Sequence, residues 1–184
     1  METSQVILVD KNDKPVGVAE KMEAHRKGLL HRAFSVFIFN SKGEMLLQRR
    51  ALHKYHSGGL WTNACCSHPN PGEDNLAAAQ RRLKEEMGIA VPVEKIFDFI
   101  YKTEFDNGLT EHEFDHVFAG QYDDHIDFNK NEVMDFCYKD IQKIRDSLQT
   151  HPEKYTAWFH LAFPGIEEWW SFHYKDKPDS YRVV

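Results

Sequence analysis

Cysteine is scarce in this chain, which has only Cys65, Cys66 and Cys137 among its 184 residues. An odd number that includes two neighbours does not suit the framework of paired disulfides that stabilises many small secreted domains. We therefore expect the three thiols to be reduced, as they are in a cytoplasmic protein.

Long hydrophobic runs are also missing. No stretch approaches the roughly 18 apolar residues that a membrane-spanning helix needs. The first residues, METSQVILVDKND, have neither the basic start nor the apolar core of a secretory signal. A net charge of −6 disfavours nucleic-acid binding, which requires a basic face. The sequence therefore predicts a cytoplasmic protein that binds neither nucleic acid nor a membrane, and it indicates no particular oligomeric state.

The length and the hydrophobic content of 41% suit one domain over residues 1–184 with a sizeable core. Residues 32–40, RAFSVFIFN, are apolar on both faces, as in a buried central strand. The other predicted strands are 6–9, 16–19, 44–50, 96–105, 109–122 and 132–138. Predicted helices follow Asp74, cover 141–149, and form an aromatic C-terminal region from about residue 151. This order predicts an α+β fold, in which helices pack on a mixed sheet.

Segment 61–89, WTNACCSHPNPGEDNLAAAQRRLKEEMGI, carries the strongest chemical signal. Cys66 and His68 are two residues apart, so their side chains share one side of an extended segment. Glu85 and Glu86 are neighbours on the following helix and point about 100° apart, so one can contact a cation while the other braces the fold. A thiol beside a helix with paired carboxylates indicates chemistry on a metal-bound anion.

Three of the eleven histidines stand out by position. His25 and His31 bracket a glycine-containing turn before the predicted central strand, and His68 follows the cysteine pair. Glu111 and Glu113 alternate along a predicted strand, so both carboxylates project from one face. Together these groups would form a mixed nitrogen and oxygen site for Mn²⁺, Zn²⁺ or Fe²⁺. The alternative is a solvated acidic strand face, which the spacing alone favours.

Cys66 has two interpretations. A free cysteine is usually a small buried residue, whereas a neighbouring cation would lower the pKa of the thiol and make it a reactive thiolate or proton carrier. Basic side chains that could supply this cation, or bind a metal-held diphosphate, stand at Lys21, Arg49, Arg50, Lys54, Arg81 and Arg82. Tyr101 and Trp158 could line the same pocket, although most aromatic residues in helices and strands belong to the core.

Part of this segment resembles the Nudix box, G-x5-E-x7-R-E-U-x-E-E-x-G-U, in which U is bulky and apolar. The matching spacing is Ser67-x5-Glu73-x7-Arg81-Arg82-Leu83-x-Glu85-Glu86-x-Gly88-Ile89. Ser67 replaces the first glycine, and Arg82 replaces the first glutamate of the central core. In Nudix hydrolases that glutamate helps to hold the metals, so a cation in its place argues against pyrophosphate hydrolysis.

A second resemblance is more specific. The string Trp61-Thr62-Asn63-x-Cys65-Cys66-x-His68-Pro69, with Arg49-Arg50-Ala51 before it and Glu111-x-Glu113 after it, resembles the type I isopentenyl diphosphate isomerases. The likeness covers about residues 6–163. It implies a Nudix-like fold and the reversible isomerisation of isopentenyl diphosphate to dimethylallyl diphosphate, through a tertiary carbocation, in isoprenoid precursor biosynthesis.

The resemblance also implies roles for individual residues. The ligands of one Mn²⁺ or Zn²⁺ would be His25, His31, His68, Glu111 and Glu113. A Mg²⁺ on the substrate diphosphate would be held by Glu86, with the Cys66 backbone carbonyl nearby. The diphosphate itself would contact Lys21, Arg50, Lys54, Ser67 and Arg82. Protons would move through Cys66 and Glu113, with Tyr101 assisting Glu113 and Trp158 facing the hydrocarbon.

Two other functions are considered. A Nudix-type hydrolase of nucleoside diphosphate derivatives fits the box, but Arg82 and the Cys66/His68 pair argue against it. A regulatory module that binds metal or phosphate also fits the box, but it gives no reason for a thiol and paired acids.

Overall fold

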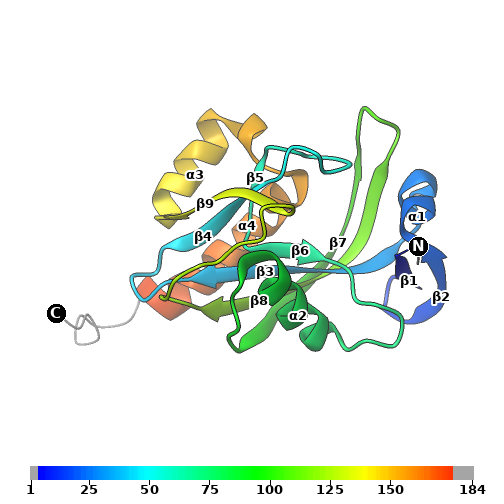
Figure 1. Ribbon diagram of the computed structural model, residues 1–184, viewed down its shortest axis with the longest axis horizontal. Helices are drawn as coiled ribbons and strands as arrows, with labels where there is room; N and C mark the ends of the chain where they lie inside the picture. Colours follow the sequence, from blue (N-terminus) through cyan, green and yellow to red (C-terminus); the bar gives the residue numbers. More distant parts are fainter. Residues whose placement is uncertain (1–3, 176–184) are drawn as a thin grey trace.

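The structure is a computed structural model that describes residues 4–175, and Figure 1 shows its sheet with helices on both sides. Its strands are β1 (Gln5–Val9), β2 (Pro15–Glu20), β3 (His31–Phe39), β4 (Met45–Arg50), β5 (Trp61–Thr62), β6 (Cys65–Ser67), β7 (Val93–Glu104), β8 (Thr110–Gln121) and β9 (Val133–Lys139). Its helices are α1 (Lys21–Lys27), α2 (Asn75–Met87), α3 (Ile141–Thr150), η1 (Pro152–Lys154), α4 (Ala157–Trp170) and η2 (Ser171–Lys175). No helix in this described part is long and apolar enough to cross a membrane.

Strand β3 lies at the centre of a mixed sheet. It runs parallel to β8 over its whole length and antiparallel to β1, β4 and β6. Strand β7 turns back into β8 through a hairpin, and β4 pairs antiparallel with β5 and β9. The predicted α+β fold with a mixed sheet is therefore confirmed.

The side chains of β3 alternate between two hydrophobic layers, as the pleat of a strand requires. Phe34, Val36 and Ile38 belong to a core that includes α2 residues. Phe37 and Phe39 belong to the opposite core, which contains residues of α3 and of the aromatic α4. The prediction that this strand is buried on both faces is confirmed, and the aromatic C-terminal region packs against the sheet.

Helix α2 places the end of the Nudix-like segment over the first of these layers. The Asp74 carboxylate caps it by accepting hydrogen bonds from the first-turn amides, and Gly88 ends it in a left-handed conformation at φ 69°. The sequence places Leu76 on the same helical stripe as the buried Leu83, but Leu76 is 39% exposed. It lies in the first turn, and burial along the helix begins only at Ala78.

Candidate active site

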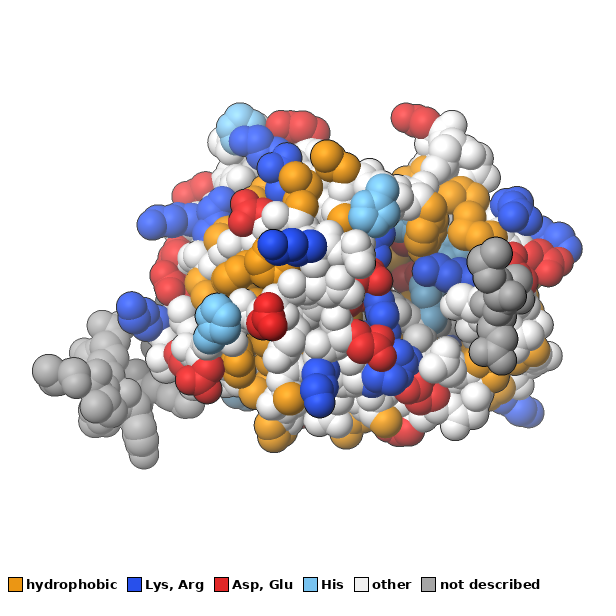
Figure 2. Space-filling model, in the orientation of Figure 1, with side chains coloured by type: hydrophobic (Ala, Val, Ile, Leu, Met, Phe, Trp, Pro, Cys, Tyr) orange, Lys and Arg blue, Asp and Glu red, His pale blue; other side chains and the backbone are white. Residues whose placement is uncertain are grey.

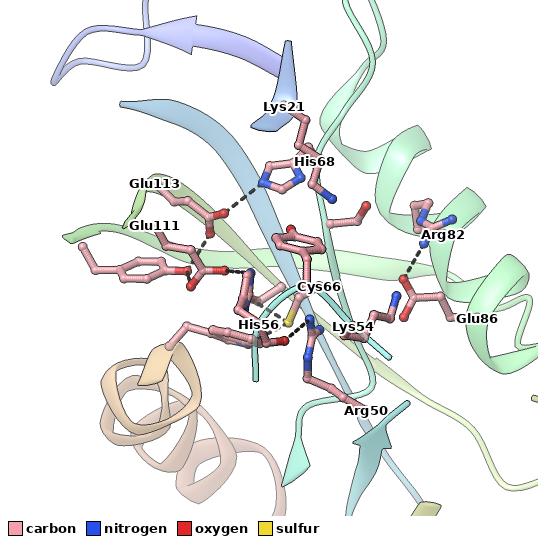
Figure 3. Close-up of a pocket in the computed structure, with 15 residues that line it drawn as sticks. Lys21, Arg50, Lys54, His56, Cys66, His68, Arg82, Glu86, Glu111 and Glu113 are labelled. Carbon is pink, nitrogen blue, oxygen red and sulfur yellow. Dashed lines mark hydrogen bonds and ion pairs between the residues drawn. The ribbon is translucent and has the colours of Figure 1, made fainter. Parts of the chain in front are cut away.

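Fifteen side chains from distant parts of the sequence line one pocket (Figure 3). They are Lys21, Ser35, Arg50, Lys54, Tyr55, His56, Cys66, Ser67, His68, Arg82, Glu86, Tyr101, Glu111, Glu113 and Trp158. The structure thus brings together all of the predicted catalytic and diphosphate-binding residues. In the space-filling view, basic, acidic and histidine side chains meet in a hollow near α1 (Figure 2).

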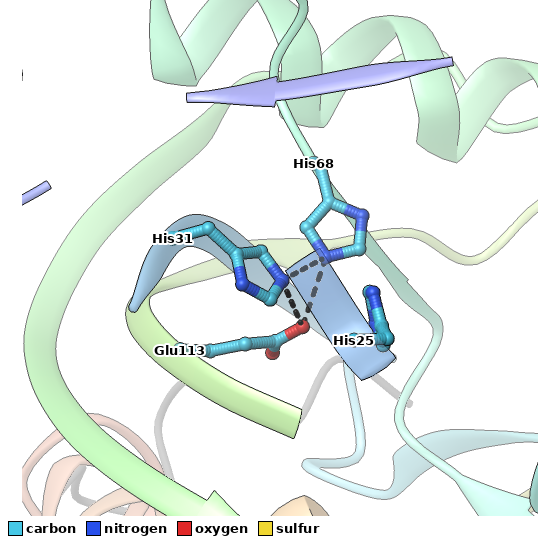
Figure 4. A group of neighbouring side chains, drawn as sticks. All are labelled: His25, His31, His68 and Glu113. Atoms are coloured by element: carbon cyan, nitrogen blue, oxygen red, sulfur yellow. Dashed lines mark hydrogen bonds and ion pairs between the residues drawn. The ribbon is translucent and has the colours of Figure 1, made fainter. Parts of the chain in front are cut away.

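Beside this pocket, three histidines and one glutamate converge (Figure 4). Potential ligand atoms of His25, His31, His68 and Glu113 all lie within 4.8 Å of one another. The Nδ1 atoms of His25 and His31 lie 2.7 and 2.8 Å from main-chain carbonyls. A carbonyl can only accept a hydrogen bond, so each Nδ1 carries a hydrogen, and Nε2 has a free lone pair in the neutral form of the ring.

The Nε2 atoms of His31 and His68 also lie close to each other and to Glu113. His31 Nε2 lies 3.2 Å from His68 Nε2, which lies 2.9 Å from Glu113 Oε1. Two imidazole nitrogens at this distance require a shared proton or a metal ion. The group therefore fits a divalent cation that accepts nitrogen and oxygen ligands.

Glu111, the fifth predicted ligand, lies in an adjoining group with His25 and His56. Its Oε1 is 2.9 Å from His56 Nε2. The Tyr101 hydroxyl lies 3.1 Å from the other Glu111 oxygen and 2.6 Å from Glu113 Oε2, so its one hydrogen is shared between two carboxylates. Glu111 and Glu113 are only 4% and 6% exposed, which excludes the alternative of a solvated strand face.

The carboxylate pair holds its charge unequally. Burial and the nearby Glu113 charge raise the pKa of Glu111 well above its usual value. Burial would also raise the pKa of Glu113, but hydrogen bonds from His31 and His68 lower it well below its usual value. The negative charge of the pair is therefore favoured on Glu113.

Burial also shifts the pKa values of the histidines. It lowers the pKa of His25 to about 4 and the pKa of His68 to about 3. Burial would lower the pKa of His31 too, but the hydrogen bond and charge of Glu113 raise it above its usual value. His25 and His68 are therefore neutral near pH 7, which is the form that binds metals.

The Cys66 thiol is half-buried and lines the pocket (Figure 3). The Trp158 indole Nε1 donates a hydrogen bond to Sγ at 2.9 Å, and the thiol donates to Asn63 Oδ1 at 3.0 Å. The Ser35 hydroxyl lies 3.6 Å from the sulfur. These contacts fix the direction of the sulfur and leave it on the pocket wall.

The prediction that a neighbouring cation holds Cys66 as a thiolate is wrong in this structure, because the net shift of its pKa is upward. Burial raises the pKa of the thiol, and the Asp115 charge raises it further. Arg50 acts in the opposite direction but has a smaller effect. Cys66 is therefore a protonated thiol at neutral pH, available as a proton donor.

Four basic side chains line the pocket, namely Lys21, Arg50, Lys54 and Arg82. Arg82 Nη2 donates to Glu86 Oε1 at 2.7 Å, and Lys54 forms an ion pair with Glu132. Burial, opposed in part by Glu86, lowers the pKa of Lys54 to about 8, and the charges of Arg50 and other cations lower it as well. Crowded cations of this kind suit a ligand with several negative charges, such as a diphosphate.

Four pocket or supporting residues were missed by the sequence analysis: Ser35, Tyr55, His56 and Asn63. Ser35 did carry a signal, because it is a polar residue within the apolar run of the central strand. Asn63 lies inside the WTN string, which marks a family but not a role. Tyr55 and His56 belong to an irregular loop, where spacing gives no indication of direction.

The chain is similar to known proteins over most of its length. Residues 29–159 match the NUDIX domain family. The isopentenyl-diphosphate Delta-isomerase of Pectobacterium atrosepticum is 52% identical over 170 residues, covering 92% of this chain and 95% of that protein. The isopentenyl-diphosphate Delta-isomerase 2 of Photorhabdus laumondii is 49% identical over 169 residues, covering 89% of this chain and 96% of that protein.

Solved structures show the same fold at low identity. The protein DR0079 from Deinococcus radiodurans has a TM-score of 0.65 at 16% identity and covers 80% of this chain and 90% of its own. A MutT protein from Methanosarcina mazei has a TM-score of 0.61 at 21% identity and covers 80% and 96%. Together with the sequence relatives, these findings show that the chain belongs to the isopentenyl-diphosphate Delta-isomerase family and is built on a NUDIX domain.

Proposed function

We propose that this chain is an isopentenyl-diphosphate Delta-isomerase that interconverts isopentenyl diphosphate and dimethylallyl diphosphate. The observation that carries the proposal is that Cys66 and Glu113 line one pocket, from two different strands, beside a cluster of cations. Membership of the isomerase family supports the same reaction.

The reaction needs both an acid and a base. The two diphosphates differ only in the position of a double bond, and an unactivated alkene has no acidic proton. The feasible route adds a proton to the terminal carbon, which gives a tertiary cation, and then removes a proton from the neighbouring methylene. An acid and a base on separate strands can act from different sides of the substrate.

We take the two roles from the resting protonation of the groups, a thiol at Cys66 and a carboxylate at Glu113. In the forward direction the Cys66 thiol would donate its proton to the terminal carbon, and the Glu113 carboxylate would accept the methylene proton. This reverses the direction predicted from the sequence, in which Glu113 donates and a thiolate accepts. The proton balance closes, because Cys66 ends as a thiolate and Glu113 as an acid, and the roles exchange in the reverse reaction.

Divalent metals would support this chemistry by supplying positive charge. The group of His25, His31, His68 and Glu113 would hold Mn²⁺ or Zn²⁺ and would fix the Glu113 carboxylate in place. Glu86 would hold Mg²⁺ next to the diphosphate, together with the Cys66 carbonyl. Further contacts to the diphosphate would come from Lys21, Arg50, Lys54, Ser67 and Arg82.

Trp158 would stabilise the cationic intermediate. The side chain is 3% exposed and packs beside Cys66 on the pocket wall. The face of an indole ring is worth about 0.5–2 kcal/mol to a nearby cation. Helix α4, which carries Trp158, would also exclude water that could trap the cation as an alcohol.

The organisation of residues 1–184 as one domain and the cytoplasmic location stay predictions from the sequence.

One assay tests the proposal. Purified full-length protein is incubated with isopentenyl diphosphate, Mg²⁺ and Mn²⁺ in D₂O, and the products are followed by NMR. Deuterated dimethylallyl diphosphate is the expected product. Released phosphate would instead identify a hydrolase, and tight binding without any reaction would identify a binding module; either result would overturn the proposal.

A further inference from the structure

His56 is a pocket residue to which neither the sequence nor the family resemblance gives a role. It lies in the loop between β4 and β5 and is 6% exposed. Its ring stacks on Phe105 with a centroid distance of 4.6 Å and an interplanar angle of 11°, and it meets the Tyr55 ring edge-on at 4.4 Å. These contacts fix the plane of the imidazole and therefore the direction of its nitrogens.

One of those nitrogens is buried without a hydrogen bond. His56 Nε2 lies 2.9 Å from Glu111 Oε1, yet it has no hydrogen-bond partner among the described residues, so the oxygen lies off the direction of the ring nitrogen. His25 Nε2 is also buried without a hydrogen-bond partner among the described residues. Leaving such atoms buried and unpaired costs about 1–3 kcal/mol each, so a pair of them needs an explanation.

The second nitrogen of each ring is already engaged. His25 Nδ1 lies 2.7 Å from a main-chain carbonyl, and His56 Nδ1 lies 3.2 Å from the Ser57 hydroxyl. Histidines that bind metals usually donate a hydrogen bond through the nitrogen that does not bind the ion. The His25 ring therefore has the arrangement of a metal ligand, and the His56 ring has the same arrangement in the tautomer in which Nδ1 donates to the Ser57 hydroxyl, with Nε2 as the binding atom in both.

We propose that His56 is a ligand of the divalent-metal centre, which it binds together with His25 and Glu111. Ligand atoms of these three residues all lie within 4.8 Å of one another. Two imidazoles and a carboxylate suit first-row metals such as Mn²⁺, Zn²⁺ and Co²⁺. The inference rests on the proposed function in one respect, because it concerns the metal centre of that site.

His25 shows how many ions this arrangement holds. It belongs both to the group of His56 and Glu111 and to the group of His31, His68 and Glu113. Its Nδ1 is engaged, so its single free lone pair on Nε2 can bind one ion at a time. The two groups would then share one ion at His25, and His56 would add a protein ligand to the five that the family resemblance implies.

The test uses Co²⁺ as a spectroscopic probe, with full-length protein that has been stripped of metal and without substrate. Titration gives the stoichiometry, the affinity and the visible absorption spectrum. The variant His56→Phe keeps an aromatic ring on Phe105 but cannot bind metal. The variant His56→Gln keeps an N–H that can donate to Glu111. His53→Ala is the matched control, because His53 is exposed in the same loop.

We expect the wild type and His53→Ala to bind one Co²⁺ at the histidine centre with the same spectrum. Both His56 variants should bind it at least about tenfold more weakly, with an altered spectrum. A wild-type spectrum and affinity in His56→Phe would overturn the proposal. Recovery in His56→Gln would also overturn it, because a hydrogen bond to Glu111 would then be sufficient.

Two further outcomes are informative. Binding of two ions by the wild type at this centre, with only one lost on substitution of His56, would overturn the shared centre. If His56→Phe does not fold, as judged by circular dichroism, His56→Gln decides the question alone. Because no turnover is measured, a negative result here leaves the isomerase proposal intact.

Discussion

The indole Nε1 of Trp158 donates a hydrogen bond to the Cys66 sulfur at 2.9 Å, which joins helix α4 to strand β6. A second route connects the same two elements. The Thr156 hydroxyl donates to the Thr62 hydroxyl at 2.9 Å, and Thr62 donates to Asn63 Oδ1 at 2.9 Å, which accepts from the thiol as well. The C-terminal region therefore orients the thiol, although the family motifs lie earlier in the chain.

Replacement of Trp158 separates its two contributions. Trp158→Phe removes the hydrogen bond to Cys66 but keeps an aromatic face, whereas Trp158→Ala removes both. An aromatic face beside a desolvated cation is worth about 2 kcal/mol, so we expect kcat to fall roughly 30-fold further in the alanine variant than in the phenylalanine variant. Steady-state kinetics measure the difference. Equal losses of kcat would exclude a role of the ring face.

Loss of either proton carrier should stop the reaction. Cys66→Ala and Glu113→Gln should each lower kcat by about 10²–10⁴-fold, the usual contribution of a general acid or base. Binding of a diphosphate inhibitor should change little in Cys66→Ala, because the basic side chains remain. The control is Cys137→Ala, on β9 outside the lining of the pocket. Near-normal turnover in either active-site variant would remove that residue from the mechanism.

Local patterns were sufficient to predict most of the fold. The two-sided apolar run of β3 predicted a strand between two layers, because alternate residues of a strand face opposite sides. Asp74 marked the start of α2, because a cap depends on only a few neighbouring residues. The helical spacing of Leu76 and Leu83 does not by itself predict that Leu76 is 39% exposed, because exposure depends on how far the helix lies over the sheet.

The candidate site was less predictable where tertiary contacts decide its chemistry. Alternation placed Glu111 and Glu113 on one face, but their burial depends on the fold around them. The pKa of Cys66 rises because burial outweighs the nearby Arg50, and sequence spacing does not measure burial. His56 lies in an irregular loop whose path is set by contacts such as the stack on Phe105.

The Glu73–Arg81 ion pair should make the stability of the fold depend on pH. Arg81 donates to both Glu73 oxygens, at 2.7 and 2.8 Å, and this lowers the pKa of Glu73 from 4.5. A lowered folded pKa stabilises the protein above the unfolded pKa, and this contribution disappears as the pH falls through the folded pKa. The Arg81 side chain is 33% exposed and the Glu73 side chain 19%, so the ion pair contributes at most about 1 kcal/mol to the free energy of unfolding.

We therefore expect Glu73→Gln to lower Tm by about 2–4 °C at neutral pH, and the difference from wild type to shrink as the pH falls below 4.5. Thermal unfolding from pH 7 to pH 3 measures it, with the exposed Glu94→Gln as control. A Tm difference that stays constant over this range would show that the loss does not come from the charge of Glu73.

Two glycines with similar backbones should respond differently to substitution. Gly72 and Gly88 have φ values of 80° and 69°, in the left-handed region that favours glycine. A Cβ at Gly72 would have no atom within 4 Å, whereas a Cβ at Gly88 would lie 2.5 Å from the Asp127 carbonyl oxygen. Alanine at either position has the cost of the left-handed backbone, about 1–2 kcal/mol, but only Gly88→Ala also displaces the main chain at Asp127.

We expect Gly72→Ala to lower Tm by about 2–8 °C and Gly88→Ala to lower it clearly more. Asparagine tolerates the left-handed region, so it isolates the steric part of the effect. Gly72→Asn should be nearly neutral, whereas Gly88→Asn should remain destabilising, because its Cβ meets the same oxygen. Calorimetric unfolding of the four variants measures these differences, and equal losses at the two positions would show that the contact with Asp127 has no energetic effect.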